Sequence, residues 1–174
     1  ACLETVSSIT KSDVWRGTSE AQVGFSVGPE ATTTTVGSGR ADIQNECVIK
    51  LSNNNYIRGK LPDNGYMNII VDSGASMTLI GSNCVEQSTY LRNLPVHTGE
   101  RVDIHVADGK TICTESFIDF EVDLGGAKVS LKAYIVQPIG LIDCLLGCPE
   151  LQKLSAVIDF ETSTLKLKVP KTVP

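Results

Sequence analysis

The chain has no apolar stretch approaching the ~20 residues that a membrane-spanning helix needs. Its first residues do not resemble a signal peptide, because Glu4 and Asp13 lie there and no apolar segment follows. Positive charge is not in excess either, since 15 Lys and Arg are outnumbered by 20 Asp and Glu, for a net charge of -5. Such a chain lacks the basic surface that binds nucleic acid or anionic lipid. We therefore expect neither nucleic acid nor a membrane as a partner.

Histidine is scarce, and no Cys-x-x-Cys pair is present. Because His97 and His105 lie far from any paired cysteines, we expect no metal site. The six cysteines could form three disulfides, but their spacing is irregular and the chain is long enough not to need them. Most lie among apolar residues, as buried free thiols do. This pattern favours a reducing, intracellular and cytoplasmic location.

The 174 residues suffice for one domain with some flexible sequence, and a hydrophobic fraction of 41% is enough for a real core. Residues 1–45 are rich in Ser, Thr and Gly and show no sustained apolar period, which predicts a flexible arm or linker. A short strand at residues 23–27 remains an alternative within it. We expect a folded domain over residues 46–170 and a tail at 171–174.

Short β-strands dominate the pattern after Cys47. Residues 56–61 and 66–71 flank Pro-Asp-Asn-Gly, which predicts a hairpin. Residues 117–124 and 129–135 alternate apolar and polar side chains, so each strand should bury one face, with acidic and basic outer faces opposite one another. A final hairpin is expected at residues 156–160 and 164–169. The fold class is therefore mostly β, with a small closed, barrel-like sheet.

Two short helices interrupt the predicted strands. One is expected to begin near Ser82, which would cap it, with Glu86 in its first turn. The other is expected over residues 149–154, with Pro149 at its first helical position.

The most informative segment is Ile-Ile-Val-Asp-Ser-Gly-Ala-Ser at residues 69–76. An apolar strand leads Asp72 into a tight turn, where Gly74 tolerates close backbone approach. Taken alone, Asp72-Ser73-Gly74 is equally well explained as a β-turn that ends a strand. Its context is needed to decide between the two.

Residues 48–168 resemble the retropepsin-like aspartic proteases of retroviruses and gypsy-class LTR retrotransposons. Residues 71–76 are similar to the catalytic loop of that family, and residues 106–110 (Val-Ala-Asp-Gly-Lys) are similar to its flap tip. Asp-Cys-Leu-Leu-Gly at residues 143–147 is similar to the segment that packs beneath the catalytic loop. The closing hairpin, residues 156–167, is common in the retroelement branch. Each element is weak alone, but the four occur in the family's order.

The resemblance implies an endopeptidase whose two facing carboxylates share one proton. The sequence has one Asp-(Ser/Thr)-Gly, so a single chain cannot supply both carboxylates. A two-fold homodimer would place Asp72 opposite its copy, and Ser73 would lock the two loops together. No cofactor is implied, so chelators should have no effect.

The resemblance also implies where an extended polypeptide would bind. Its contacts would come from the catalytic loop, the flap tip and the segment beneath the loop, namely Ala75, Ser76, Ala107, Asp108, Gly109, Leu145 and Leu146. Taken alone, residues 108–109 are an ordinary hairpin turn, and residues 145–147 a core strand that ends in glycine.

The sequence departs from many retroviral members at Ser76 and Cys148, where an acidic residue and an arginine would form a pair. Both partners are absent together, so no buried charge is left alone. The expected biological setting is polyprotein processing by a retroelement, with a virus-like particle as one location. The alternatives are a non-catalytic dimerisation or partner-binding module, and a generic small β-barrel binding domain.

Overall fold

The computed structural model describes residues 44–106 and 108–170. In this part of the chain the helices are α1 (Ser82–Gln87), α2 (Thr89–Arg92) and α3 (Cys148–Lys153). The strands are β1 (Gln44–Lys50), β2 (Tyr56–Lys60), β3 (Tyr66–Val71), β4 (Leu79–Gly81), β5 (His97–His105), β6 (Thr111–Leu124), β7 (Ala127–Val136), β8 (Cys144–Leu146), β9 (Val157–Asp159) and β10 (Thr164–Pro170). The predicted class, mostly β with a few short helices, is confirmed.

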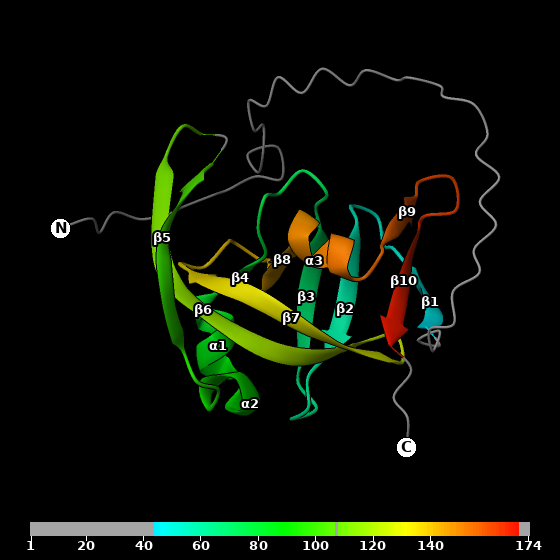
Figure 1. Cartoon of the computed structure of the whole chain (residues 1–174), viewed down its shortest axis with the longest axis horizontal. Helices are drawn as coiled ribbons and strands as arrows, with labels where there is room; N and C mark the ends of the chain where they lie inside the picture. The colour runs from blue at the N-terminus through cyan, green and yellow to red at the C-terminus, as the bar shows by residue number, and fades with distance from the viewer. Residues whose placement is uncertain (1–43, 107, 171–174) are drawn as a thin grey trace, which may run out of the picture.

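The main sheet runs in the order β2-β3-β8-β4-β7-β6-β5 (Figure 1). A pairing of Lys60 with Asp123 joins β2 to β6, so six strands form a closed circuit and β5 extends beyond it as an edge strand. Gly59 allows this closure, because a Cβ at that position would press against Val122 on β6. The closed sheet that the sequence predicted therefore depends on the contact between β2 and β6 at Gly59 and Lys60.

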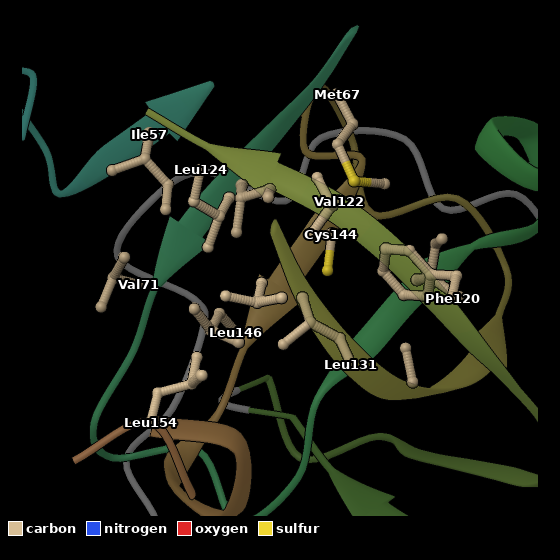
Figure 2. Packing of buried hydrophobic residues seen from close by; sticks show 14 of the residues in the cluster. Ile57, Met67, Val71, Phe120, Val122, Leu124, Leu131, Cys144, Leu146 and Leu154 are labelled. Atoms are coloured by element: carbon tan, nitrogen blue, oxygen red, sulfur yellow. The ribbon is translucent and has the colours of Figure 1, made fainter. Parts of the chain in front are cut away.

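The core follows from the alternation of side chains along the strands. Ile118, Phe120, Val122 and Leu124 on β6 are at most 1% exposed, and Leu131 on the paired strand β7 packs in the same cluster. Figure 2 shows these side chains meeting residues of β3 and β8 inside the circuit. The predicted antiparallel pair is confirmed, and its outer faces oppose acidic and basic residues, with Asp119 opposite Lys132 and Asp123 opposite Lys128.

The β2–β3 hairpin is also confirmed, whereas the helix boundaries need correction. Gly81, the last residue of β4, is the N-cap of α1, and no side chain caps that helix. Ser82 is therefore the first helical residue and not the cap, and Glu86 does not lie in the first turn. Helix α3 begins at Cys148, so Pro149 occupies its second position. Helix α2 was not predicted.

A second sheet, in the order β1-β10-β9, contains the predicted closing hairpin. Strand β1 pairs with β10 along its whole length, from Gln44 opposite Pro170 to Lys50 opposite Thr164. Apart from Gln44 and Asn45, the predicted arm lies outside the described residues, as do the alternative strand at 23–27 and the tail. Over the described ranges, no helix has the length and apolar character needed to cross a membrane.

The cysteines only partly match the expectation of buried thiols. All five in the described ranges are free, and Cys84 and Cys144 are buried. Burial raises the pKa of Cys84 to about 12. Cys113 is exposed, while Cys47 and Cys148 are half-buried.

Candidate active site

Asp72 directly follows the last residue of β3, where the chain turns toward β4. Its backbone amide donates to Leu146 O (3.0 Å), which extends the parallel pairing of β3 with β8 by one residue. Ala75 N donates to Asp72 O (3.2 Å) and closes the turn. Ser73 and Gly74 are therefore displayed at the surface, while Ala75 is buried.

Asp72 is half-buried, and the two oxygens of its carboxylate differ in their hydrogen bonding. Oδ1 accepts a hydrogen bond from Gly74 N (2.9 Å), as in an Asx-turn. Oδ2 accepts no hydrogen bond from the described residues, and the Ser73 hydroxyl donates none to them. The turn thus orients one carboxylate oxygen and leaves the other available.

The segment after β8 lies directly against this loop. Cys148 N donates to Ala75 O (2.8 Å), and Gly147 N donates to the buried hydroxyl of Thr78 (2.9 Å). A Cβ on Gly147 would collide with the carbonyl oxygen of Met77, so only glycine permits this approach. The structure therefore brings residues 143–147 and the Asp72 loop together, as the resemblance implied.

Leu145 and Leu146 are both completely buried and belong to different clusters. Leu146 packs in the main core, whereas Leu145 packs with Ala75 and Ile104 in a smaller cluster. Within one chain, Leu145 packs in one cluster with Ala75 of the loop, whereas Leu146 contacts the loop through its carbonyl oxygen, which accepts from Asp72 N. Ser76, by contrast, is exposed beside it.

The predicted flap is the hairpin of β5 and β6, whose tip comprises residues 106–110 (Figure 1). Gly109 has a φ of +84°, which favours glycine, and its amide donates to Val106 O (2.9 Å). Asp108 Oδ1 accepts from Lys110 N (2.9 Å), and the Lys110 ammonium lies 3.2 Å from Asp108 Oδ2. These contacts lower the pKa of Asp108, and the hydrogen bond from Lys110 N is the largest cause. Asp108 therefore shapes the hairpin tip, and Ala107 lies outside the described residues.

Apolar side chains close to the hairpin tip link the hairpin to the Asp72 loop. Ile104 on β5 is 1% exposed and shares a cluster with Ala75, while Val102 and Ile112 pack against that cluster. Our reading of the sequence did not include Ile104 among the site residues. The alternation of Val102, Ile104 and Val106 could have predicted that this strand buries an apolar face that includes Ile104. Thr78 carried no such signal.

Within one chain, Asp72 is half-buried, while Ser73, Gly74 and Ser76 around it are exposed. A cavity of about 300 Å³ borders Lys60, Asn64, Glu121 and Lys128, at the opposite end of β3 from Asp72. In the described ranges, no group of three His, Cys, Asp or Glu could hold a metal ion. The arrangement near Asp72 thus presents one carboxylate on an exposed turn, with a hairpin packed beside it.

Comparisons with known proteins agree with this geometry. No curated protein matches the chain. Among solved structures, it is similar to the retroviral protease-like domain of Ddi1 from Leishmania major, with a TM-score of 0.50 and 19% identity over 68% of this chain and 93% of that one. The EIAV protease complexed with the inhibitor HBY-793 has a TM-score of 0.49 and 14% identity over 63% of this chain and 96% of that one. A retropepsin-like aspartic protease from Rickettsia conorii has a TM-score of 0.44 and 18% identity, over 74% and 94% respectively.

At these identities the structural likeness concerns the fold. The family model described as "Aspartyl protease" matches residues 57–149, which run from β2 to the start of α3. That segment is more than half of the chain and includes the Asp72 loop, the hairpin and residues 143–147. The chain therefore belongs to the aspartyl protease family and has the retropepsin-like fold.

Proposed function

We propose that this protein is an aspartic endopeptidase that acts as a homodimer, with Asp72 of each copy as the catalytic carboxyl group. The observation that carries the proposal is the Asp72 carboxylate itself. It lies on an exposed turn, with Oδ1 held by Gly74 N at 2.9 Å and Oδ2 unbonded within the described residues.

The need for a second copy follows from the chemistry. Two carboxylates about 3 Å apart cannot both ionise, so one proton is shared between them. The ionised member takes a proton from water as general base, and the protonated member donates to the carbonyl oxygen of the scissile bond. Because the sequence has one Asp-(Ser/Thr)-Gly, the second carboxyl group must come from the symmetry-related Asp72.

The surface around Asp72 is suited to such a contact. Ser73 and Gly74 are exposed at the tip of the turn, where Ser73 can donate to the other copy. Elsewhere, the separate β1-β10-β9 sheet carries exposed apolar side chains, since Val48 and Val157 lie in one row across Lys166 and are each 56% exposed. Burying these side chains would favour association.

The substrate we propose is an extended polypeptide. The hairpin of β5 and β6 would fold over it, with Asp108 and Gly109 at the tip, and Ala75 and Ser76 would lie below. An extended chain can pair with exposed backbone groups in such a groove, which is β-strand addition. We propose retroelement polyprotein processing as the setting, on the basis of the sequence resemblance.

The decisive experiment compares the wild-type protein with Asp72→Asn on a peptide library between pH 4 and 7. We expect the wild-type protein to cleave, a statine-type inhibitor to block cleavage, and specific activity to rise with protein concentration as dimers form. Removing general acid–base catalysis should lower the rate at least about 100-fold. Asp119→Asn, an exposed aspartate on β6, is the matched control and should cleave normally.

Sedimentation of the wild-type protein and of Asp72→Asn measures whether each forms a dimer, and this result separates an active protease from a non-catalytic module. If the wild-type protein dimerises but cleaves no peptide, the non-catalytic module is correct and the protease proposal fails. If Asp72→Asn cleaves as fast as the wild-type protein, the activity does not come from this site.

A further inference from the structure

We infer that Thr78 is a positioning residue for the Asp72 carboxyl group, and that its buried hydroxyl sets the direction in which this carboxyl group points. Thr78 touches neither the reacting atoms nor the substrate surface. This inference rests on the proposed function, but part of its test does not require activity.

The position of Thr78 is unusual in this protein. Only two polar residues in the described ranges are buried, Thr78 and Glu150, and Thr78 is 2% exposed. Its carbonyl oxygen accepts from Tyr134 N (2.9 Å), which holds its backbone on β7. Its hydroxyl oxygen accepts from Gly147 N (2.9 Å) in the interior. One residue therefore ties together the end of the Asp72 loop, β7 and the segment that follows β8.

The hydroxyl is needed because Gly147 N–H has no access to water. The hydrogen bond that this amide makes is buried, and glycine at 147 lets the backbone of Met77 lie directly on the residue. A buried amide without a partner is costly, and the structure avoids it with the Thr78 side chain. Valine at 78 would keep the shape but leave the amide unpaired, and the loop would have to move for water to reach it.

The link from Thr78 to Asp72 runs through a short, fully bonded loop. Within the described structure, three hydrogen bonds join residues 72–78 to residues 146–148: Asp72 N to Leu146 O, Cys148 N to Ala75 O, and Gly147 N to the Thr78 hydroxyl. The last is the only one of the three that a side chain makes. Without it, the end of the loop keeps its backbone bond from Tyr134 N but is no longer tied to the segment that follows β8.

A shift of the loop end reaches the carboxylate through Gly74. The amide of Gly74 holds Asp72 Oδ1 at 2.9 Å, and Gly74 is followed by Ala75, whose carbonyl bonds to Cys148. When residues 75–78 move, that amide turns and the carboxylate turns with it. Small errors in the placement of a catalytic group are enough to slow a reaction without weakening substrate binding.

The test compares Thr78→Val, which removes the hydroxyl at nearly constant volume, with Thr78→Ser, which keeps the hydroxyl and loses the methyl group. We expect Thr78→Val to lower kcat by about tenfold or more, with KM within about twofold of wild type. Thr78→Ser should restore most of kcat. The pH profile of kcat should shift in Thr78→Val alone. Thr89→Val on α2 removes a hydroxyl far from Asp72 and should leave kcat unchanged.

A second readout is independent of turnover. Carbon NMR can follow the titration of the Asp72 carboxyl group, and hydrogen exchange can follow Gly147 N–H. Thr78→Val should alter the titration and speed up the exchange, whereas Thr78→Ser should do neither. If Thr78→Val does not fold, Thr78→Ala against Thr78→Ser makes the same comparison of hydroxyl present and absent.

The outcomes distinguish this inference from the proposed function. If the wild-type protein cleaves nothing, the protease proposal fails, and the titration and exchange data still decide the role of Thr78. If Thr78→Val merely lowers Tm and leaves kcat, the pH profile and the Asp72 titration unchanged, Thr78 is only structural and the inference is overturned.

Discussion

The carboxylate of Asp63 accepts a hydrogen bond of 3.0 Å from the backbone amide of Tyr90, which lies 27 residues further along the chain. The same carboxylate accepts from the Ser88 hydroxyl (2.7 Å) and from Gly65 N (3.0 Å). The phenol of Tyr90 in turn accepts from Glu121 N on β6 (2.9 Å). One turn residue thus connects the β2–β3 hairpin to α2 and, through Tyr90, to the main sheet.

These bonds hold the pKa of Asp63 well below its usual range, with the bond from the Ser88 hydroxyl as the largest cause. A carboxyl group whose pKa is lowered by folding stabilises the protein above its unfolded pKa of about 3.9, and this contribution is lost as the pH falls toward the folded pKa. Asp63→Asn removes the charge that strengthens these hydrogen bonds and should therefore cost about 1 kcal/mol at pH 7. The difference from wild type should shrink at pH 3. Urea unfolding at both pH values measures it.

The control for this prediction is Glu86→Gln, which changes an exposed carboxylate on α1. It should alter the unfolding free energy very little at either pH. A cost for Asp63→Asn that is the same at pH 3 and pH 7 would show that the charge of Asp63 is unimportant.

Gly147→Ala should strongly destabilise the fold. The added Cβ would meet the backbone carbonyl of Met77, which is fixed at the end of the Asp72 loop and cannot rotate away. We expect a loss of about 3 kcal/mol or more in the free energy of unfolding, measured by thermal or urea denaturation. Gly140→Ala is the control. Its φ of +62° is left-handed but no atom lies near the new Cβ, so it should cost only about 1–2 kcal/mol. Equal costs for the two variants would contradict the close approach at Gly147.

Lys153→Met should destabilise α3 and its packing. The ammonium of Lys153 lies 3.3 Å from both carboxylate oxygens of Glu150, whose side chain is 6% exposed. Without it, a buried carboxylate loses its partner, at a cost of about 1–3 kcal/mol at pH 7.

Two further variants check the origin of this effect. Glu150→Gln combined with Lys153→Met should be more stable at pH 7 than Lys153→Met alone, because no charge is left buried. Lys110→Met breaks an exposed pair with Asp108 and should cost less than about 1 kcal/mol. The explanation fails if the double variant is no more stable than Lys153→Met.

Cleavage should be fastest at acidic pH. In the proposed dimer the two Asp72 carboxyl groups share one proton, so activity requires one of them to remain protonated and the other ionised. The rate should fall on both sides of an optimum below pH 7, and the profile should be insensitive to chelators. Initial rates on one peptide from pH 3 to 9 measure it. A rate that stays constant into the alkaline range is incompatible with a shared proton.

Several elements could be predicted because their signals are local. The alternation of apolar and polar residues predicts β6 and β7. In each strand every second side chain is apolar and faces the core, as Phe120 does on β6 and Leu131 on β7. The Pro-Asp-Asn-Gly turn predicts the β2–β3 hairpin. The prediction that Ser82 caps α1 was wrong. Strand β4 runs directly into the helix at Gly81, so Gly81 is the N-cap and Ser82 is already helical. Helix α2 was missed because four residues contain no period to detect.

The Asp72 loop could be located from sequence because the strand, the aspartate and the glycine are consecutive. The residues that hold it could not, because they come from distant parts of the chain. Thr78 and Gly147 meet across 69 residues, and Ile104 reaches Ala75 only because β5 folds back over the loop. No pattern of neighbouring residues encodes such meetings.

The sequence by itself determined the strands, the turn that carries Asp72 and the presence of one such turn per chain, because side-chain alternation and turn chemistry act between near neighbours. Only the tertiary structure decided that Asp63 would accept a hydrogen bond from Tyr90 N in α2, that Leu145 would pack in one cluster with Ala75 of the loop, and that the Thr78 hydroxyl would accept from Gly147 N. Those contacts depend on how the closed circuit of strands brings distant backbone groups out of water, where each must find a partner.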